Sequence, residues 1–328
     1  MLKISRLHGI GAAVLLTVAA TTAVALNRFA GAGAEARFVE YPMTQPQDMP
    51  TAVAAAPDGS IWFTLDLADA IGRVRDGKIE RLPTQGRNVE PIGLGAASDG
   101  GAWYTDAAAR AVKRIDPSGT ITSYPLDTPI VRLGRLSVAP DGAAWFAEGT
   151  SFSITSLRDG TLTRHVYDAL PGGPYGVAAA PDGAVWATLQ DANQLLRVGG
   201  DGSVQSFDIP QRGSVPTDIA VGPDGSAWFI QFWRNRIGRF KDGMFTEFDV
   251  PTENAGLSGL VAAPDGSVWF GMLRTGSLGR LRDGKVATFK IPRERARPYS
   301  LAIDRDGGVW YADITGYVGM LPAQYARD

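Results

Sequence analysis

The sequence predicts an all-β protein, a seven-bladed β-propeller with four antiparallel strands in each blade and a last blade closed by the N-terminal strand. Three observations support this prediction. Tryptophan recurs at a spacing of 41 or 42 residues, and an Asp-Gly pair precedes each repeated tryptophan by four residues. A strand pattern that is missing at the C-terminus also occurs near the N-terminus.

The repeated tryptophans mark the second strand of each blade, and they are Trp62, Trp103, Trp145, Trp186, Trp228, Trp269 and Trp310. The preceding Asp-Gly pairs are typical of tight hairpins, because both residues tolerate positive φ. In the first repeat we expect strands at 51–56, 61–64, 71–74 and 78–82. The second strands do not alternate between apolar and polar residues, as expected where neighbouring blades cover both faces of a sheet.

The two ends of the chain are predicted to complete one blade. After Trp310 a third strand is expected at 318–321, but no fourth strand follows it. Residues 38–42 match the fourth strands at 245–251 and 286–292 of other repeats. This segment would cover the open edge of the last blade. The pattern therefore predicts a single propeller domain over 35–328, which can exist as a monomer because no strand edge is left free.

Residues 1–34 resemble a signal peptide or an N-terminal membrane anchor. Lys3 and Arg6 precede an apolar run over 10–26, and Ala32-Gly33-Ala34 is the best cleavage candidate. We expect export and cleavage, which would place the protein in the periplasm or outside the cell. If the leader is not cleaved, residues 10–26 would anchor the protein to the membrane.

The composition excludes several kinds of chemistry. The chain has no cysteine, which removes disulfides, thiolate nucleophiles and iron–sulfur clusters. Its two histidines are His8 in the leader and His165, which aligns with phenylalanines of other outer strands, so neither is expected to act as a base. The net charge of −2 predicts no nucleic-acid partner. No organic cofactor is expected.

One face of the predicted propeller carries the variable loops, which join strand two to strand three and strand four to the next blade. Function usually lies on such loops. The third residue after each tryptophan begins a strand two-to-three loop, and it is acidic at Asp106, Glu148 and Asp313. We expect these carboxylates to point toward the mouth of the channel, where they would bind Mg²⁺ or Ca²⁺. Alternatively, they cap loop amides or pair with Arg110, Arg135 or Arg297.

Aromatic and polar side chains on the same face form a candidate binding group. They are Tyr175 and Tyr299 at matching starts of first strands, Trp233 outside the repeat, Gln231 at a position that is acidic in three other repeats, and Arg297. Such groups bind small molecules or partner proteins. Alternatively, the tyrosines pack between blades and the arginines are solvated. Arginines eleven residues after a tryptophan recur in five blades and are expected to belong to the scaffold: Arg73, Arg114, Arg197, Arg239 and Arg280.

The repeat resembles that of the streptogramin lyase (virginiamycin B lyase) family over residues 38–321. The resemblance is carried by segments such as APDGSIWFT at 56–64 with IGRV at 71–74, and PDGSAWF at 223–229 with IGRF at 237–240. It implies a Mg²⁺-dependent carbon–oxygen lyase that opens a cyclic depsipeptide by elimination across its ester. In active members, histidines on the variable loops act with glutamates at the metal. No loop after a repeated tryptophan contains a histidine here.

Only Glu148 follows the family's acidic pattern after a Trp-Phe pair, so Glu148 is the candidate catalytic base as well as a candidate metal ligand. Three functions stay open. The first is a lyase that uses Glu148, Asp106 or Asp313 with Mg²⁺ on a cyclic ester-type substrate. The second is a non-catalytic propeller that binds a small molecule, a glycan or a protein. The third is a metal-dependent lactone hydrolase of the gluconolactonase type.

Overall fold

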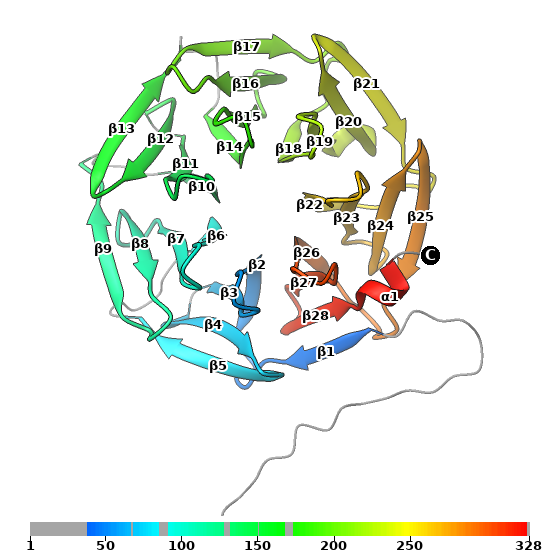
Figure 1. Cartoon of the computed structure of the whole chain (residues 1–328). Coiled ribbons are helices and arrows are strands. Elements are labelled where there is room, and N and C mark those ends of the chain that lie inside the picture. The colour runs from blue at the N-terminus through cyan, green and yellow to red at the C-terminus, as the bar shows by residue number, and fades with distance from the viewer. Residues whose placement is uncertain are drawn as a thin grey trace, which may run out of the picture.

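The computed structural model describes residues 38–66, 68–84, 91–127, 132–149, 151–167 and 173–326. Within these residues the strands form seven four-stranded antiparallel sheets, arranged as blades around a central axis (Figure 1). The predicted seven-bladed propeller is therefore confirmed. The leader expected at 1–34 lies outside the described residues. Among the described residues, no helix has the length and apolar character needed to cross a membrane.

Each blade extends from an inner strand beside the channel to an outer strand at the rim (Figure 1). Blades one and two consist of β2 (Met49–Ala55), β3 (Ile61–Asp66), β4 (Ala70–Arg75), β5 (Lys78–Pro83), β6 (Leu94–Ala96), β7 (Ala102–Asp106), β8 (Ala111–Ile115) and β9 (Ile121–Pro125). Blades three and four consist of β10 (Leu133–Val138), β11 (Ala144–Glu148), β12 (Ser153–Arg158), β13 (Thr161–Val166), β14 (Pro174–Ala179), β15 (Val185–Leu189), β16 (Gln194–Val198) and β17 (Val204–Asp208).

Blades five and six consist of β18 (Pro216–Val221), β19 (Ala227–Gln231), β20 (Arg236–Lys241), β21 (Met244–Asp249), β22 (Leu257–Ala262), β23 (Val268–Met272), β24 (Ser277–Arg282) and β25 (Lys285–Lys290). Blade seven consists of β26 (Pro298–Ile303), β27 (Val309–Asp313), β28 (Tyr317–Leu321) and β1 (Val39–Pro42). Two short helical segments are η1 (Phe232–Arg234) and α1 (Ala323–Ala326).

The N-terminal strand closes the ring as predicted. β1 pairs antiparallel with β28, and Tyr41 lies opposite Val318 in the register. The Tyr41 ring also stacks on Trp310, with the ring centroids 5.8 Å apart. Backbone pairing and this aromatic contact together remove the free edge of the last blade.

The hydrophobic core lies between the blades rather than within one blade. Trp186 of blade four packs in one cluster with Ile219 and Phe229 of blade five. In blade one, Trp62 packs toward blade two, whereas its neighbour Phe63 packs toward blade seven. Both faces of each second strand are therefore buried, which explains why these strands lack polar alternation.

The recurrent Ile-Gly-Arg segment serves this packing. Gly72 lies opposite Phe63 in the register, and a Cβ at Gly72 would lie 1.9 Å from the Phe63 ring. The ring therefore needs a glycine below it. The next residue, Arg73, places its guanidinium 4.9 Å from the centroid of Trp62. All five recurrent arginines contact their own tryptophans in this way, which confirms their scaffold role.

The Asp-Gly turns form tight hairpins, but of two kinds. Between strands three and four, both residues have positive φ, as in Asp76 (50°) and Gly77 (71°). Between strands one and two, only the glycine does, as in Gly59 (92°). Here Asp58 accepts a hydrogen bond from the Ser60 N–H at 2.9 Å. The aspartate is therefore selected as a cap of the turn and not for positive φ.

Candidate functional site

The third residue after each repeated tryptophan is buried in all seven blades. Side chains at this position include Leu65, Leu189 and Met272, each at most 1% exposed. The three acidic members, Asp106, Glu148 and Asp313, are also at most 1% exposed. The expectation that they point toward the mouth of the channel is wrong. Each carboxylate instead pairs with a cationic side chain that does not belong to an inner strand, namely Lys113, Arg164 or Arg293.

Asp106 forms a buried ion pair inside blade two. Its Oδ2 lies 2.7 Å from Nζ of Lys113 on β8, and its Oδ1 accepts the Ala109 N–H at 3.0 Å. Lys113 lies opposite Tyr104, where blade one has the glycine Gly72 opposite Phe63. The lysine and the aspartate are therefore a matched local substitution in this blade.

Glu148 is held by an arginine of the outer strand. Arg164 on β13 donates to Oε2 from Nε at 2.9 Å and to Oε1 from Nη2 at 3.2 Å. The Thr155 hydroxyl donates to Oε2 at 2.8 Å. Hydrogen bonds and charges from Glu148 and Asp127 raise the pKa of Arg164. This is a charge-assisted, bidentate contact that holds Glu148 in place.

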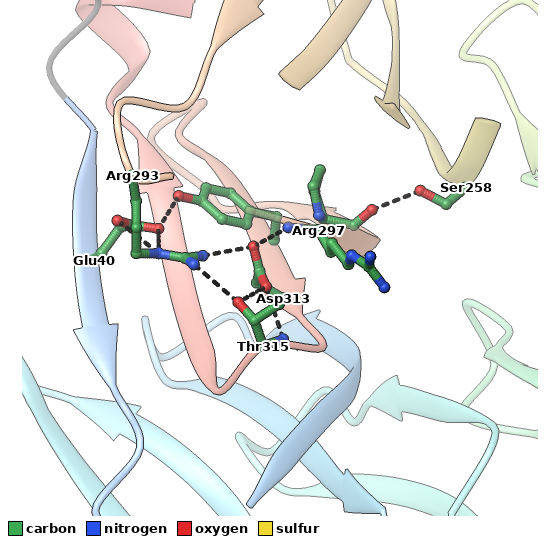
Figure 2. A network of polar contacts seen from close by, with 8 residues as sticks. Glu40, Ser258, Arg293, Arg297, Asp313 and Thr315 are labelled. Carbon is green, nitrogen blue, oxygen red and sulfur yellow. Dashed lines mark hydrogen bonds and ion pairs between the residues drawn. The ribbon is translucent and has the colours of Figure 1, made fainter. Parts of the chain in front are cut away.

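Asp313 belongs to a network that fastens the closing strand (Figure 2). Arg293 donates to Asp313 at 2.6 Å from Nη2 and to Glu40 at 3.0 Å from Nε. Asp313 also accepts the Arg297 N–H at 2.6 Å and the Thr315 hydroxyl at 2.6 Å. Its carboxylate therefore joins the loop before β26, which contains Arg293 and Arg297, to the loop after β27, which contains Thr315.

These positions do not fit a magnesium site. Asp106, Glu148 and Asp313 lie in blades two, three and seven, and each already neutralises a nearby cation. A Mg²⁺ site needs several oxygen ligands directed at one point. Within the part of the chain that the structure describes, no group of three or more His, Cys, Asp or Glu side chains could hold a metal ion.

Gln231 is the neutral counterpart of these acids. It is fully buried, accepts from the Ser214 hydroxyl at 3.2 Å and donates to Glu247 at 2.9 Å. Glu247 in turn pairs with Arg236 at 2.9 Å. The amide nitrogen of Gln231 is thus directed into its own blade, and its amide oxygen binds the connection between blades four and five.

Tyr175 and Tyr299 are brought together in the central channel. They come from the inner strands of blades four and seven, and their side chains interact electrostatically. The Arg135 guanidinium of blade three lies 5.3 Å from the centroid of the Tyr299 ring. Asp218 of blade five contributes an electrostatic interaction to both Arg135 and Tyr175. We call Arg135, Tyr175, Asp218 and Tyr299 the channel cluster.

Sequence reasoning missed Asp218 and assigned Arg135 only as a possible partner of the loop acids. A signal was present in the repeat. Arg135 and Asp218 occupy the register position that precedes the anchoring aliphatic residue of the inner strand. The other five blades have small residues there: Ala52, Gly93, Gly176, Gly259 and Ser300. Two large side chains of opposite charge among small ones mark this position as unusual.

Two pockets open among the loops of the predicted variable face. The channel-side pocket has a volume of about 320 Å³, and its lining includes Ile92, Arg132, Pro174, Tyr175, Gln190 and Asp191. The Trp233 pocket has a volume of about 260 Å³ and is lined by Phe232, Trp233, Asn235, Asn254, Gly256 and Arg274. Tyr175 thus belongs both to the channel-side pocket and to the channel cluster.

The other predicted binding residues lie elsewhere. Trp233 is 69% exposed on η1 of blade five, where it shares a pocket with Asn254 and Arg274, and it is therefore separate from the channel cluster. Arg297 is exposed, and its backbone N–H binds Asp313 (Figure 2). His165 stacks on Trp145 with centroids 5.1 Å apart, and burial lowers its pKa. It is a packing residue, equivalent to Phe248 on Trp228.

The model of the virginiamycin B lyase family matches residues 16–170 and 135–324. This chain belongs to that family. A virginiamycin B lyase of Nocardia farcinica is 33% identical over 196 residues, which cover 59% of this chain and 67% of that protein. One of Bordetella parapertussis is 46% identical over only 48 residues, 15% of this chain and 16% of that protein.

Solved structures of the virginiamycin B lyase family share the fold. One is a catalytically inactive histidine-to-alanine variant of virginiamycin B lyase from Staphylococcus aureus with quinupristin. It is 27% identical, with a TM-score of 0.82, and the match covers 87% of this chain and 99% of that chain. A streptogramin B lyase structure also has a TM-score of 0.82, with 25% identity over 86% of this chain and 96% of that one. The resemblance inferred from the repeat is thereby confirmed.

Proposed function

We propose that this member of the virginiamycin B lyase family is an exported propeller that binds a cyclic depsipeptide-type small molecule on its loop face without opening it. One observation carries the proposal. The three buried carboxylates expected to supply a base and a metal site are each bound to a cation of the scaffold, in three different blades. A ligand-binding pocket on the same face does not depend on them.

The channel-side pocket supports the binding half of the proposal. It combines an aromatic ring, an arginine and an amide-bearing side chain in Tyr175, Arg132 and Gln190. Ligand sites commonly unite apolar surface with a few polar groups in this way. The Staphylococcus aureus relative with quinupristin has the same fold. A comparable cyclic molecule is therefore the first ligand to test.

The second candidate is the lyase activity that the family name suggests. Elimination needs a base that removes a proton next to a carbonyl, and a cation that stabilises the resulting enolate. The proposed base is Glu148, and it would have to separate from Arg164 and Thr155 before accepting a proton. A lactone hydrolase that uses Mg²⁺ or Ca²⁺ would need the same release. Family membership favours this candidate, whereas the ion pairs oppose it.

The test uses the purified chain with quinupristin, and with Mg²⁺, Ca²⁺ or a chelator in parallel samples. Calorimetry measures binding. Chromatographic retention with fragmentation measures ring opening, because elimination leaves the mass unchanged. We expect binding in every sample, an intact ring, and weaker binding in Tyr175→Ala.

Glu148→Gln separates the two candidates. We expect it to leave quinupristin binding unchanged, whereas chelator-sensitive ring opening that is lost in this variant would establish the lyase instead. Trp233→Ala serves as the control for the other pocket. Loss of binding in Trp233→Ala but not in Tyr175→Ala would assign the ligand to the Trp233 pocket and overturn the placement proposed here. The absence of any binding would overturn the proposed function itself.

A further inference from the structure

The central channel contains a cation that the scaffold does not neutralise by direct contact. Arg135 is partly exposed to solvent. Its Nε is buried and has no hydrogen-bond partner. Among the described residues, no carboxylate oxygen lies within 4.0 Å of a guanidinium nitrogen of Arg135. An arginine placed in this way has donors available for a ligand.

Asp218 interacts electrostatically with Arg135, but its carboxylate oxygens bind backbone N–H groups. Its Oδ1 accepts the N–H of Ile219 at 3.1 Å, and its Oδ2 accepts the N–H of Leu260 on the next inner strand at 3.0 Å. Burial acts to lower the pKa of Arg135, but the electrostatic interactions with Asp218, Tyr175 and Tyr299 together outweigh it, so the pKa is raised. Asp218 therefore keeps the guanidinium charged from a distance and does not occupy its donors.

The two tyrosines add hydroxyl donors beside the guanidinium. Burial raises the pKa of Tyr175 to about 12, although the charge of Arg135 opposes this effect. The Tyr175 phenol is therefore protonated at neutral pH. Each phenol hydroxyl has one proton that it can donate to a ligand. The guanidinium lies over the face of the Tyr299 ring, in a cation–π contact.

We propose that Arg135, Tyr175 and Tyr299 form an oxyanion-binding site in the central channel, which takes the carboxylate or phosphate group of a small ligand. The guanidinium fork matches the geometry of both groups, and the tyrosine hydroxyl adds a third kind of donor. This site goes beyond the proposed depsipeptide binding, and the two share only Tyr175, which also lines the channel-side pocket.

The charges around the site predict the direction in which the affinity for an anion changes when one of them is removed. The charged or titratable groups of the channel cluster are Arg135, Tyr175, Tyr299 and Asp218. Asp218 repels a bound anion, so removal of its charge should strengthen binding. A ligand held through an ammonium or a metal ion would respond in the opposite direction. Asp218→Asn thus distinguishes an oxyanion from a cation.

The experiment titrates the full chain with benzoate, with the neutral isostere benzamide, and with inorganic phosphate. Calorimetry measures affinity, and NMR follows the arginine Nε–H signals, of which Arg135→Gln identifies the relevant one. We expect benzoate or phosphate to bind and to shift that signal, and benzamide to bind at least about tenfold more weakly. The preferred anion decides between a carboxylate and a phosphate ligand.

Variants test the assignment. Arg135→Gln should weaken anion binding at least about tenfold, Tyr299→Phe should weaken it less, and Asp218→Asn should strengthen it at least about threefold. Arg305→Gln removes an exposed arginine from a turn on the opposite face, and it should have no effect. Thermal unfolding checks that each variant is folded.

Equal binding of benzoate and benzamide, unchanged affinity in Arg135→Gln, or weaker binding in Asp218→Asn would overturn the oxyanion site. The depsipeptide proposal is tested separately, because Arg135→Gln and Glu148→Gln leave the channel-side pocket lining unchanged. If quinupristin binds and benzoate and phosphate do not, only the oxyanion inference fails. If the anions bind and quinupristin does not, only the proposed function fails.

Discussion

Arg293 lies 2.6 Å from the buried carboxylate of Asp313 and, through its other edge, 3.0 Å from Glu40 on the N-terminal strand (Figure 2). Its guanidinium also covers the ring of Tyr317 at 3.8 Å. Tyr311 donates its hydroxyl to Glu40 at 2.9 Å. One arginine from the connection between blades six and seven therefore secures the strand that closes the ring.

We expect Arg293→Met to lower the free energy of unfolding by about 3 kcal/mol, because it leaves Asp313 buried without its cation. Urea unfolding followed by tryptophan fluorescence measures the change. Arg305→Met is the control, since that side chain is 61% exposed in its pair with Asp306, and a change below about 0.5 kcal/mol is expected there. Equal effects in the two variants would contradict the role of Arg293.

The coupling within the buried pair Asp106–Lys113 can be measured by a double-mutant cycle, in which both residues are replaced by those of blade one. Blade one has Leu65 and Gly72 at the same two positions. Asp106→Leu and Lys113→Gly should each cost about 2–4 kcal/mol, because each leaves a buried charge unpaired. The double variant should cost less than the sum of the two by at least about 2 kcal/mol. Additive costs in denaturant unfolding would show that the pair is not coupled.

The ion pairs of the three loop acids predict that divalent metals do not stabilise the fold through them. We expect the unfolding temperature to change by less than about 1 °C when Mg²⁺, Ca²⁺ or a chelator is added, because binding to the native state alone would raise it. Scanning calorimetry measures this. A rise with Mg²⁺ that disappears in both Glu148→Gln and Asp313→Asn would instead support the metal site expected from the sequence.

His165 predicts a pH dependence between about 5 and 8. Burial lowers its pKa in the folded protein, so its contribution to stability is present above the unfolded pKa of about 6.5 and is lost as pH falls through the lower folded pKa. His165→Phe, the residue at the equivalent position of blade four, removes this loss. We expect its advantage to be larger at pH 5 than at pH 8 by about 0.5–1 kcal/mol.

Thermal unfolding at the two pH values tests the role of His165. Phe207→Leu is the control, because it removes an aromatic contact with Trp186 without removing an ionisable group. Its effect should be the same at both pH values. A His165→Phe effect that does not depend on pH would show that this imidazole does not titrate in the folded protein within this range.

Asp224 predicts a second pH dependence of stability, in the acidic range. Burial acts to raise its pKa, but hydrogen bonds from Lys241 and Ser226 outweigh it, so the pKa is lowered. The stabilisation it contributes is present above the unfolded pKa of about 3.9 and is lost as pH falls through the folded pKa. Because the side chain is 44% exposed, we expect Asp224→Asn to cost only about 0.5–1 kcal/mol at pH 7.

Unfolding measured from pH 7 down to about pH 2 tests whether this stabilisation decreases as the pH falls. Most of the contribution of the carboxylate should disappear over that range. Asn keeps the acceptor for the Ser226 N–H, which Asp224 now binds at 3.1 Å, so the turn itself should persist. Asp76→Asn in an exposed turn is the matched control. A cost at acidic pH as large as that at pH 7 would contradict the prediction.

The repeat could be predicted because its signals are local. An Asp-Gly turn, a tryptophan and an arginine eleven residues later interact within one blade, as Trp62 and Arg73 do. The closure by residues 38–42 could be predicted for the same reason, since the segment repeats the pattern of the outer strands. Short-range turn chemistry and a fixed period are sufficient for such elements.

The direction of the loop acids could not be predicted, because it depends on residues of other strands. Glu148 turns away from the channel because Arg164 lies on the outer strand, and Asp106 does so because a lysine replaces a glycine on β8. Equivalent positions in other blades hold leucine and methionine in the same burial. Residue type at the start of a loop is therefore a poor guide to orientation when a buried cation is within reach.

From its sequence alone, the protein is determined to be a seven-bladed propeller with a scaffold arginine in five blades, because period, turns and strand patterns are properties of neighbouring residues. Only the closed ring decides that Arg135, Tyr175, Asp218 and Tyr299 share one channel. They come from four blades, and their proximity arises from the circular packing of those blades around the axis (Figure 1).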